Sequence, residues 1–358
     1  MTLAQQLAAR TLELVQTDSV YGDEACLADH LEAWAAGRFG AAQVRRVGNS
    51  LVAGAPRRPG RPLVALVGHL DTVPAHPGDP APAIEGGRVV GLGASDMKGG
   101  VAVALALADA LELEALPYDL LWVLYDKEEG PHEQSGLGPV LEACPELAEI
   151  ELAVVMEPTD GVAQVGCVGS IHATLTFEGK AAHSARPWHG ENAVHKAGPF
   201  LAELAALAPA EVEVEGHIFR EVVSITLAEG GRFRNVIPER FTLNLNYRFA
   251  PGRSLDEAQR QVEAWVAGRA QLRFDDLAPS GAVPAPTPLY RHFLTATGVE
   301  VAPKQAWTDV ARLSEAGIPA LNYGPGLTSQ AHQQGEYCEI DALVASYEAL
   351  WRFLSQPA

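Results

Sequence analysis

Three apolar runs that each lead into histidine or acidic residues constrain the fold of this chain most strongly. They are RPLVALVGHLD at 61–71, YDLLWVLYDKEEG at 118–130 and IELAVVMEPTD at 150–160. Between the first two lies an Ala- and Leu-rich segment at 99–116, which predicts a long helix. Strands that alternate with helices at this spacing predict an α/β fold with a mostly parallel sheet covered by helices. In such sheets functional residues collect beyond the carboxyl ends of the strands.

The pattern changes after about residue 168. Alternating strand-like segments and two helical segments follow, at 170–179, 191–207, 222–231, 239–250, 254–268 and 270–276. They predict a small α+β sandwich, and the Pro-, Gly- and Ala-rich LAPSGAVPAPTP returns the chain to a further apolar run and a final helix. We therefore expect a discontinuous catalytic domain, 1–168 and 281–358, with a lid domain inserted at 169–280.

Composition excludes several classes of protein. The 358 residues carry a net charge of −19, which disfavours nucleic acids and anionic membranes as partners. No uninterrupted apolar run reaches the roughly 18 residues of a membrane-spanning helix. The four cysteines are scattered and form no C-x-x-C pair, so we expect free thiols and a cytoplasmic location.

Two short motifs supply the first candidate site residues. In GHLDTVP, His69 ends an apolar run and Asp71 lies on the same side of an extended chain. A carboxylate beside a metal-binding histidine can accept its other ring N–H and fix the tautomer. In GLGASDMKGG, Asp96 precedes the predicted helix, where it is either a metal ligand or an N-cap.

Four further side chains complete a candidate metal centre: Glu128, Glu129, Glu157 and His332. Taken singly, each is more often a surface group than a ligand. Together with His69 and Asp96 they supply two histidines and several carboxylates at one edge of one sheet. Two divalent ions would offset the repulsion among these carboxylates. Nitrogen and oxygen ligands without cysteine suit zinc, with manganese or cobalt as possible substitutes.

The order and spacing of the motifs resemble those of a known family. GHLDTVP, GLGASDMKGG, YDKEEG, MEPT, GKAAHSARPWHGENAVHK, NVIPERFTLNLNYRFAP and a late GP…AH extend over residues 68–332. They resemble the dizinc amidohydrolase and peptidase family of succinyl-diaminopimelate desuccinylases, acetylornithine deacetylases and aminoacylases. Within this family the chain is most similar to the short desuccinylases of actinobacterial type.

The resemblance implies a role for each residue of the centre. His69 and Glu157 would hold one zinc ion, Glu129 and His332 the other, and Asp96 would bridge both. Glu128 would act as the general base, and Asp71 would orient His69. Such a two-metal centre hydrolyses amide bonds.

The resemblance also implies roles for residues outside the strand ends. His183, in AAHSARP, would stabilise the oxyanion in the site of a neighbouring subunit, which implies a homodimer formed through the lid domain. Arg248 would bind a substrate carboxylate with help from Asn235, and Thr308 would add a polar contact. The alternatives are a surface histidine at a turn for His183 and a lid salt bridge or dimer contact for Arg248.

We expect a hydrolase of small anionic N-acyl amino acids or peptides, with N-succinyl-L,L-diaminopimelate as the leading substrate, in lysine biosynthesis. Better-known proteobacterial desuccinylases carry an Arg-Arg pair before the Gly-Ser of the lid-entry loop, where this chain has GCVGS with Cys167 and Val168. Either other groups recognise the succinyl group or the acyl group differs. The alternatives are an acetylornithine deacetylase, another N-acyl-amino-acid hydrolase, and a dizinc carboxypeptidase or dipeptidase. A non-catalytic binding protein would lack a base or a ligand, and every matched position is filled.

Overall fold

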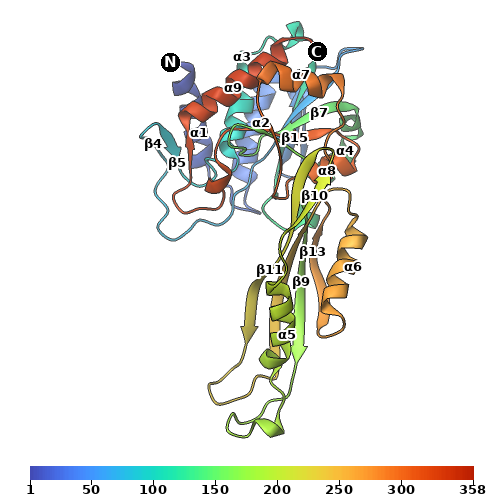
Figure 1. The fold of residues 1–358 in the computed structure, drawn as a ribbon. Coiled ribbons are helices and arrows are strands. Elements are labelled where there is room, and N and C mark those ends of the chain that lie inside the picture. The colour runs from blue at the N-terminus through green and yellow to red at the C-terminus, as the bar shows by residue number, and fades with distance from the viewer. The chain divides into compact units, whose positions relative to one another are not determined.

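The chain folds into two compact units (Figure 1). The computed structural model describes residues 1–358. The first unit comprises residues 1–166, 283–302 and 312–358, and the second comprises 167–282 and 303–311. The sequence placed 303–311 in the first domain. In the structure this segment groups with the second unit, because the Trp307 indole N–H donates to the Pro279 carbonyl and the Cys167 thiol donates to the Thr308 carbonyl.

An eight-stranded sheet forms the centre of the first unit, in the order β1-β2-β6-β3-β7-β15-β8-β14. The strands are β1 (Val44–Val47), β2 (Ser50–Gly54), β3 (Leu63–His69), β6 (Asp119–Tyr125), β7 (Ile150–Val155), β8 (Ala163–Val165), β14 (Val301–Pro303) and β15 (Ala320–Asn322). The four middle strands run parallel, since β3 pairs in parallel with β6 and β7, and β7 with β15. Every residue of β3 is buried, as expected of a strand covered on both faces. The parallel middle of the sheet confirms the predicted α/β class.

Helices cover this sheet. They are α1 (Leu3–Gln16), α2 (Ala25–Phe39), α3 (Lys98–Ala110), α4 (Leu137–Ala143), α7 (Pro288–Thr297), α8 (Val310–Glu315) and α9 (Ile340–Ser355). Residues of α1, α3, α7 and α9 form one apolar core with Val64, Leu120 and Leu152, which share one face of the sheet.

A small three-stranded sheet completes the first unit. Its strands are β4 (Ala83–Glu85), β5 (Arg88–Val90) and β16 (Tyr337–Glu339), in the order β16-β5-β4. None of the helices combines the length and the hydropathy that crossing a bilayer demands.

The second unit is a five-stranded antiparallel sheet with two helices. The strands, in the order β10-β11-β12-β9-β13, are β10 (Ala210–Val214), β11 (His217–Gly230), β12 (Arg240–Phe249), β9 (Gly169–Glu178) and β13 (Gln271–Ala278). The helices α5 (Ala193–Ala205) and α6 (Leu255–Val266) share an apolar core with β9 and β12. The sequence pattern did not predict β10, a five-residue strand that has no buried residue.

Candidate metal centre

Three neighbouring strands deliver the acidic and histidine side chains to one edge of the first sheet. His69 is the last residue of β3, and it pairs in register with Tyr125, the last residue of β6. Glu128 and Glu129 follow β6, and Glu157 follows β7, which flanks β3 on its other side. The parallel register therefore brings these four predicted side chains to the same place, as strand ends in α/β sheets do.

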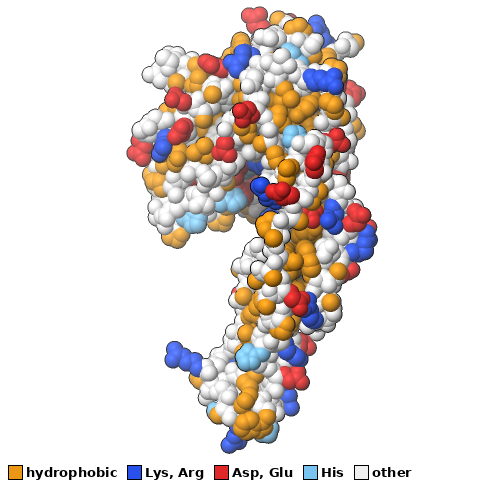
Figure 2. Space-filling view, viewed as in Figure 1, with side chains coloured by type: hydrophobic (Ala, Val, Ile, Leu, Met, Phe, Trp, Pro, Cys, Tyr) orange, Lys and Arg blue, Asp and Glu red, His pale blue; other side chains and the backbone are white.

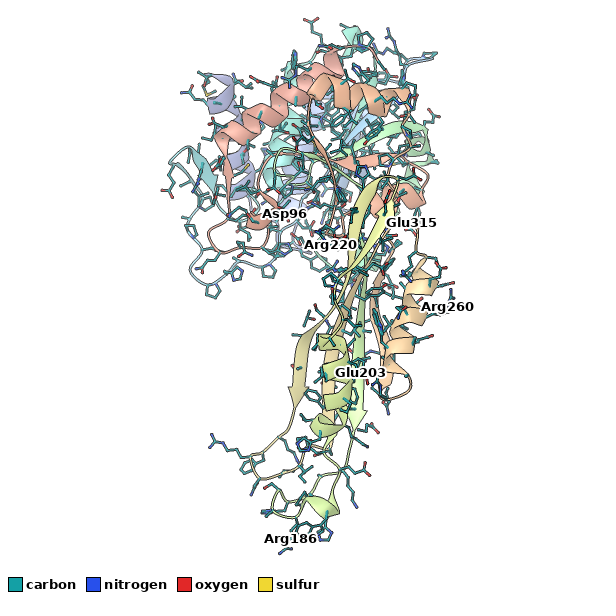
Figure 3. All side chains as sticks on the ribbon, viewed as in Figure 1. Asp96, Arg186, Glu203, Arg220, Arg260 and Glu315 are labelled. Carbon is teal, nitrogen blue, oxygen red and sulfur yellow. The ribbon has the colours of Figure 1, made fainter.

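Asp96 and His332 reach the same place from two loops. His69 Nε2 lies 3.2 Å from Asp96 Oδ1 and 3.8 Å from Glu157 Oε1. His332 Nε2 lies 2.9 Å from Glu129 Oε2 and 3.8 Å from Asp96 Oδ2. The two carboxylate oxygens of Asp96, which is labelled in Figure 3, thus face different histidines. This is the arrangement that a carboxylate shared by two ions requires.

The side chains form three overlapping groups of possible metal ligands. In each group, one ligand atom per residue lies within 4.8 Å of the others: His69 with Asp96 and Glu157, Asp96 with Glu129 and His332, and His69 with Glu128 and Glu129. Neighbouring carboxylates favour the protonated, positively charged form of both histidines. Burial acts to lower the pKa of His69, but hydrogen bonds to Asp71 and Asp96 raise it well above 6.5. A hydrogen bond to Glu129 raises the pKa of His332 to about 9.

Asp71 holds the pair of glutamates through their backbone. Its buried carboxylate accepts the N–H of Glu128 at 3.0 Å and the N–H of Glu129 at 2.9 Å. Lys127, just before the pair, turns the chain with a φ of 61°. The Nδ1 atom of His69 lies 3.0 Å from the backbone carbonyl oxygen of Asp71 and 3.6 Å from its carboxylate. The nearest contacts of the Asp71 carboxylate are therefore the two glutamate amides, which the sequence did not indicate.

Glu336 is a residue of this region that the sequence analysis missed. Its side chain is buried, and its carboxylate accepts the backbone N–H groups of Gly93, Ser95 and Asp96. Burial raises the pKa of Glu336 to about 7, against the lowering effect of these donors. The only sequence signal was its place four residues after His332, in the segment AHQQGE.

The four predicted side chains outside the metal centre all lie in the second unit. His183 and Asn235 occupy adjoining loops, since Ser184 N–H donates to the Asn235 carbonyl and His183 pairs with Val236 in an isolated bridge. The other two are Arg248 and Thr308. The Nε–H of Arg248 donates to Asn246 Oδ1 at 3.0 Å, and burial lowers the pKa of the guanidinium. The buried hydroxyl of Thr308 has no hydrogen-bond partner. Their roles in binding remain predictions.

Comparison with known proteins identifies the family. The model of Peptidase family M20/M25/M40 matches residues 65–356. A succinyl-diaminopimelate desuccinylase of Corynebacterium glutamicum is 37% identical over 359 residues, which cover 97% of this chain and 95% of the relative. The chain belongs to Peptidase family M20/M25/M40. It is accordingly a metal-dependent hydrolase of amide bonds.

Solved peptidase structures share its fold. A tripeptidase from Staphylococcus aureus has a TM-score of 0.81 at 20% identity, covering 99% of this chain and 98% of the other. A dinuclear metal-binding peptidase from Bacillus subtilis has a TM-score of 0.67 at 17% identity, covering 98% and 97%. The donor set of this chain suits the metal dependence of the family, because the clustered side chains offer imidazole nitrogens and carboxylate oxygens and no thiol.

Proposed function

We propose that this M20-family chain is a two-zinc hydrolase that removes the succinyl group from N-succinyl-L,L-diaminopimelate, in lysine biosynthesis. The observation that carries the two-metal part is the placement of the Asp96 carboxylate, with one oxygen toward each histidine. The relative from Corynebacterium glutamicum, similar over nearly the whole of both chains, supports the choice of substrate.

The proposed ligands divide as the distances suggest. His69 and Glu157 would hold one ion, Glu129 and His332 would hold the other, and Asp96 would be shared by both. Cobalt or manganese can occupy such a nitrogen and oxygen site as well as zinc. When bound, the ions polarise the amide carbonyl and lower the pKa of water.

Glu128 is the general base in this proposal. Its carboxylate lies in the group with His69 and Glu129, and the hydrogen bond from its N–H to Asp71 fixes its backbone. Glu128 accepts a proton from water as the water oxygen bonds to the acyl carbon. It returns the proton to the amide nitrogen as the carbon–nitrogen bond breaks, so that succinate and the free amine leave.

The second unit supplies recognition of the substrate in this proposal. Arg248 pairs with the carboxylate of the acyl group, and Asn246 orients the guanidinium through its contact with Nε. Asn235 and Thr308 add polar contacts. Cys167, which stands where proteobacterial desuccinylases carry arginine, has a buried thiol bonded to the Thr308 carbonyl. Arg248 is therefore the cation that we assign to the succinyl carboxylate.

We also propose a homodimer formed through the second unit, in which His183 stabilises the oxyanion in the partner's site. Residues 222–230 of β11 pair with β12 on one side, while β10 pairs only with residues 217–221. This leaves a strand edge available to a second copy. Leu227 and Phe233 are 64% and 72% exposed beside it, and Figure 2 shows apolar side chains on the surface of this unit. Analytical ultracentrifugation tests this proposal, and a monomer at micromolar concentration would overturn it.

The cytoplasmic location is also part of the proposal. Cys144, Cys167 and Cys338 are buried and unpaired, as expected in a reducing compartment.

A substrate panel tests the proposed reaction. Purified protein with measured zinc content is assayed against N-succinyl-diaminopimelate, N-acetylornithine, other N-acyl amino acids and dipeptides, and the compounds are compared by kcat/KM. We expect the succinyl compound to rank first and a chelator to abolish its hydrolysis. If an acetyl or peptide substrate ranks first, the choice of acyl group is wrong. If zinc-loaded protein hydrolyses none of them, the proposed reaction is wrong.

A further inference from the structure

The proposed reaction gives no part to Glu336, a buried carboxylate beside the metal centre. The residue is 2% exposed, although it lies in a loop just before β16. Oε2 accepts the N–H of Gly93 at 2.8 Å, and Oε1 accepts those of Ser95 at 2.7 Å and Asp96 at 2.9 Å. Both oxygens are thus engaged by backbone donors, and Glu336 belongs to none of the groups of possible ligands.

These hydrogen bonds join the two loops that carry ligands from outside the strand ends. One is the loop before α3, which contains Asp96, and the other leads from His332 to β16. The backbone adds a further link, from Gly91 N–H to the Glu336 carbonyl at 2.8 Å. The first loop is irregular, so few regular backbone bonds are available to fix Asp96. The three backbone N–H groups that donate to the Glu336 carboxylate fix the loop instead.

We propose that Glu336 is a positioning residue of the metal centre, an inference that rests on the two-metal function proposed above. Its carboxylate holds the backbone of Asp96 in the place from which one side-chain oxygen faces His69 and the other faces His332. Glu336 touches neither metal nor substrate and acts through Asp96. Mutation of a residue that hydrogen-bonds to a metal ligand commonly lowers metal affinity by about 10–100-fold.

An amide at this position cannot reproduce the pattern. In Glu336→Gln the oxygen can still accept from Ser95 and Asp96, but the NH₂ group then faces the N–H of Gly93. The reverse orientation turns the NH₂ group toward the other two donors. In either case at least one buried N–H loses its acceptor, and the loop that carries Asp96 shifts. Glu339→Gln is the matched control, because Glu339 is exposed and its carboxylate pairs with Arg88 across the small sheet at 3.2 Å.

The test is a metal titration of chelator-stripped, full-length protein. Wild type, Glu336→Gln and Glu339→Gln are titrated with Zn²⁺ in competition with a chromophoric chelator, and with Co²⁺ while the visible absorption is recorded. We expect Glu336→Gln to bind Zn²⁺ at least about 10-fold more weakly and to change the Co²⁺ absorption, and the control to match wild type. Unchanged affinity and an unchanged Co²⁺ spectrum in folded Glu336→Gln would overturn the proposal. Wild-type protein that binds fewer than two ions would instead refute the two-metal site itself.

Amide hydrogen exchange in wild-type protein keeps the proposal testable if Glu336→Gln does not fold. In metal-stripped wild type, we expect the amides of Gly93, Ser95 and Asp96 to exchange at least about 100-fold more slowly than unstructured amides, because Glu336 accepts all three. Exchange of these amides at the unstructured rate would show that the carboxylate does not hold the loop, and would overturn the inference.

Discussion

Replacing Asp71 by asparagine tests whether this carboxylate holds the two glutamates at the metal centre. Asp71 is fully buried, and its oxygens accept the backbone N–H groups of Glu128 and Glu129 at 3.0 and 2.9 Å. Asparagine keeps one acceptor oxygen, and its NH₂ group must face the other donor. His69 keeps its nearest partner in the variant, because Nδ1 contacts the backbone carbonyl of residue 71.

The expected loss of stability in Asp71→Asn follows from these two hydrogen bonds. One hydrogen bond changes from a charged to a neutral acceptor, which weakens it by about 1 kcal/mol. The other leaves a partly buried N–H without an acceptor, at a cost of about 1–3 kcal/mol. We therefore expect Asp71→Asn to lower the free energy of unfolding of the metal-stripped first unit by about 2–4 kcal/mol.

The difference in unfolding free energy between wild type and Asp71→Asn should depend on pH. Burial acts to raise the pKa of Asp71, but interactions with His69 and the two amides leave it below its ordinary value of 3.8. A carboxyl group whose pKa is lowered by folding stabilises the protein above its unfolded pKa, and that stabilisation is lost as the pH falls through the folded pKa. The gap between variant and wild type should thus be full at pH 7 and shrink in acid.

Urea unfolding of metal-stripped protein, followed by circular dichroism, measures the difference. Asp23→Asn is the matched control, because Asp23 is exposed in the same unit and its side chain makes no hydrogen bond. We expect the control to match wild type within about 0.5 kcal/mol. If Asp71→Asn also falls within that margin, the Asp71 carboxylate does not hold the glutamate pair.

Three further expectations concern the glutamate pair and the thiols. Glu128→Gln should keep both metal ions and lose about 10²–10⁴-fold in kcat, as measured by plasma emission and amide hydrolysis; full activity would exclude Glu128 as the base. Glu129→Gln should keep one ion tightly and weaken the other, as seen by metal titration; two tight ions would contradict its assignment. At pH 8 a thiol reagent should label Cys26, which is exposed, and leave Cys338 unlabelled. Burial raises the pKa of Cys338 from 9.0 to about 12, so its protonated form stabilises the native chain below pH 9, and this contribution is lost as the pH rises toward 12. Rapid labelling of all four cysteines in native protein would refute this burial.

The strand-end part of the site was predictable from local sequence. A run of buried residues such as 63–69 predicts a strand, and α/β topology then brings strand ends together without any knowledge of contacts. His69 and Glu157 follow from that rule. His332 does not, since it lies in a loop with a φ of 60°, and the sequence offered it only as a histidine in a loop that follows a predicted strand.

Residues that support the ligands were not predictable in the same way. The contacts of Glu336 with Gly93 and Asp96 join loops more than 200 positions apart, and no local pattern encodes such a pairing. For the same reason the sequence did not show that 303–311 groups with the second unit. Local periodicity reports elements and their order, whereas these contacts depend on how distant loops meet.

We expect the stability of the first unit to depend on bound metal ions, because of the carboxylates that support the ligands. Asp71 and Glu336 add two buried carboxylates beside three proposed acidic ligands and the proposed base Glu128. The metal-stripped site therefore carries a concentration of negative charge that backbone N–H donors only partly offset. Bound ions would relieve this repulsion and add binding free energy to folding, about 4 kcal/mol at a thousand-fold excess over Kd. The second unit contains none of the metal-ligand groups. We therefore expect zinc to raise the unfolding temperature of the first unit far more than that of the second, as measured by hydrogen exchange during heating. An equal rise in the unfolding temperature of both units would show that zinc does not stabilise the first unit selectively.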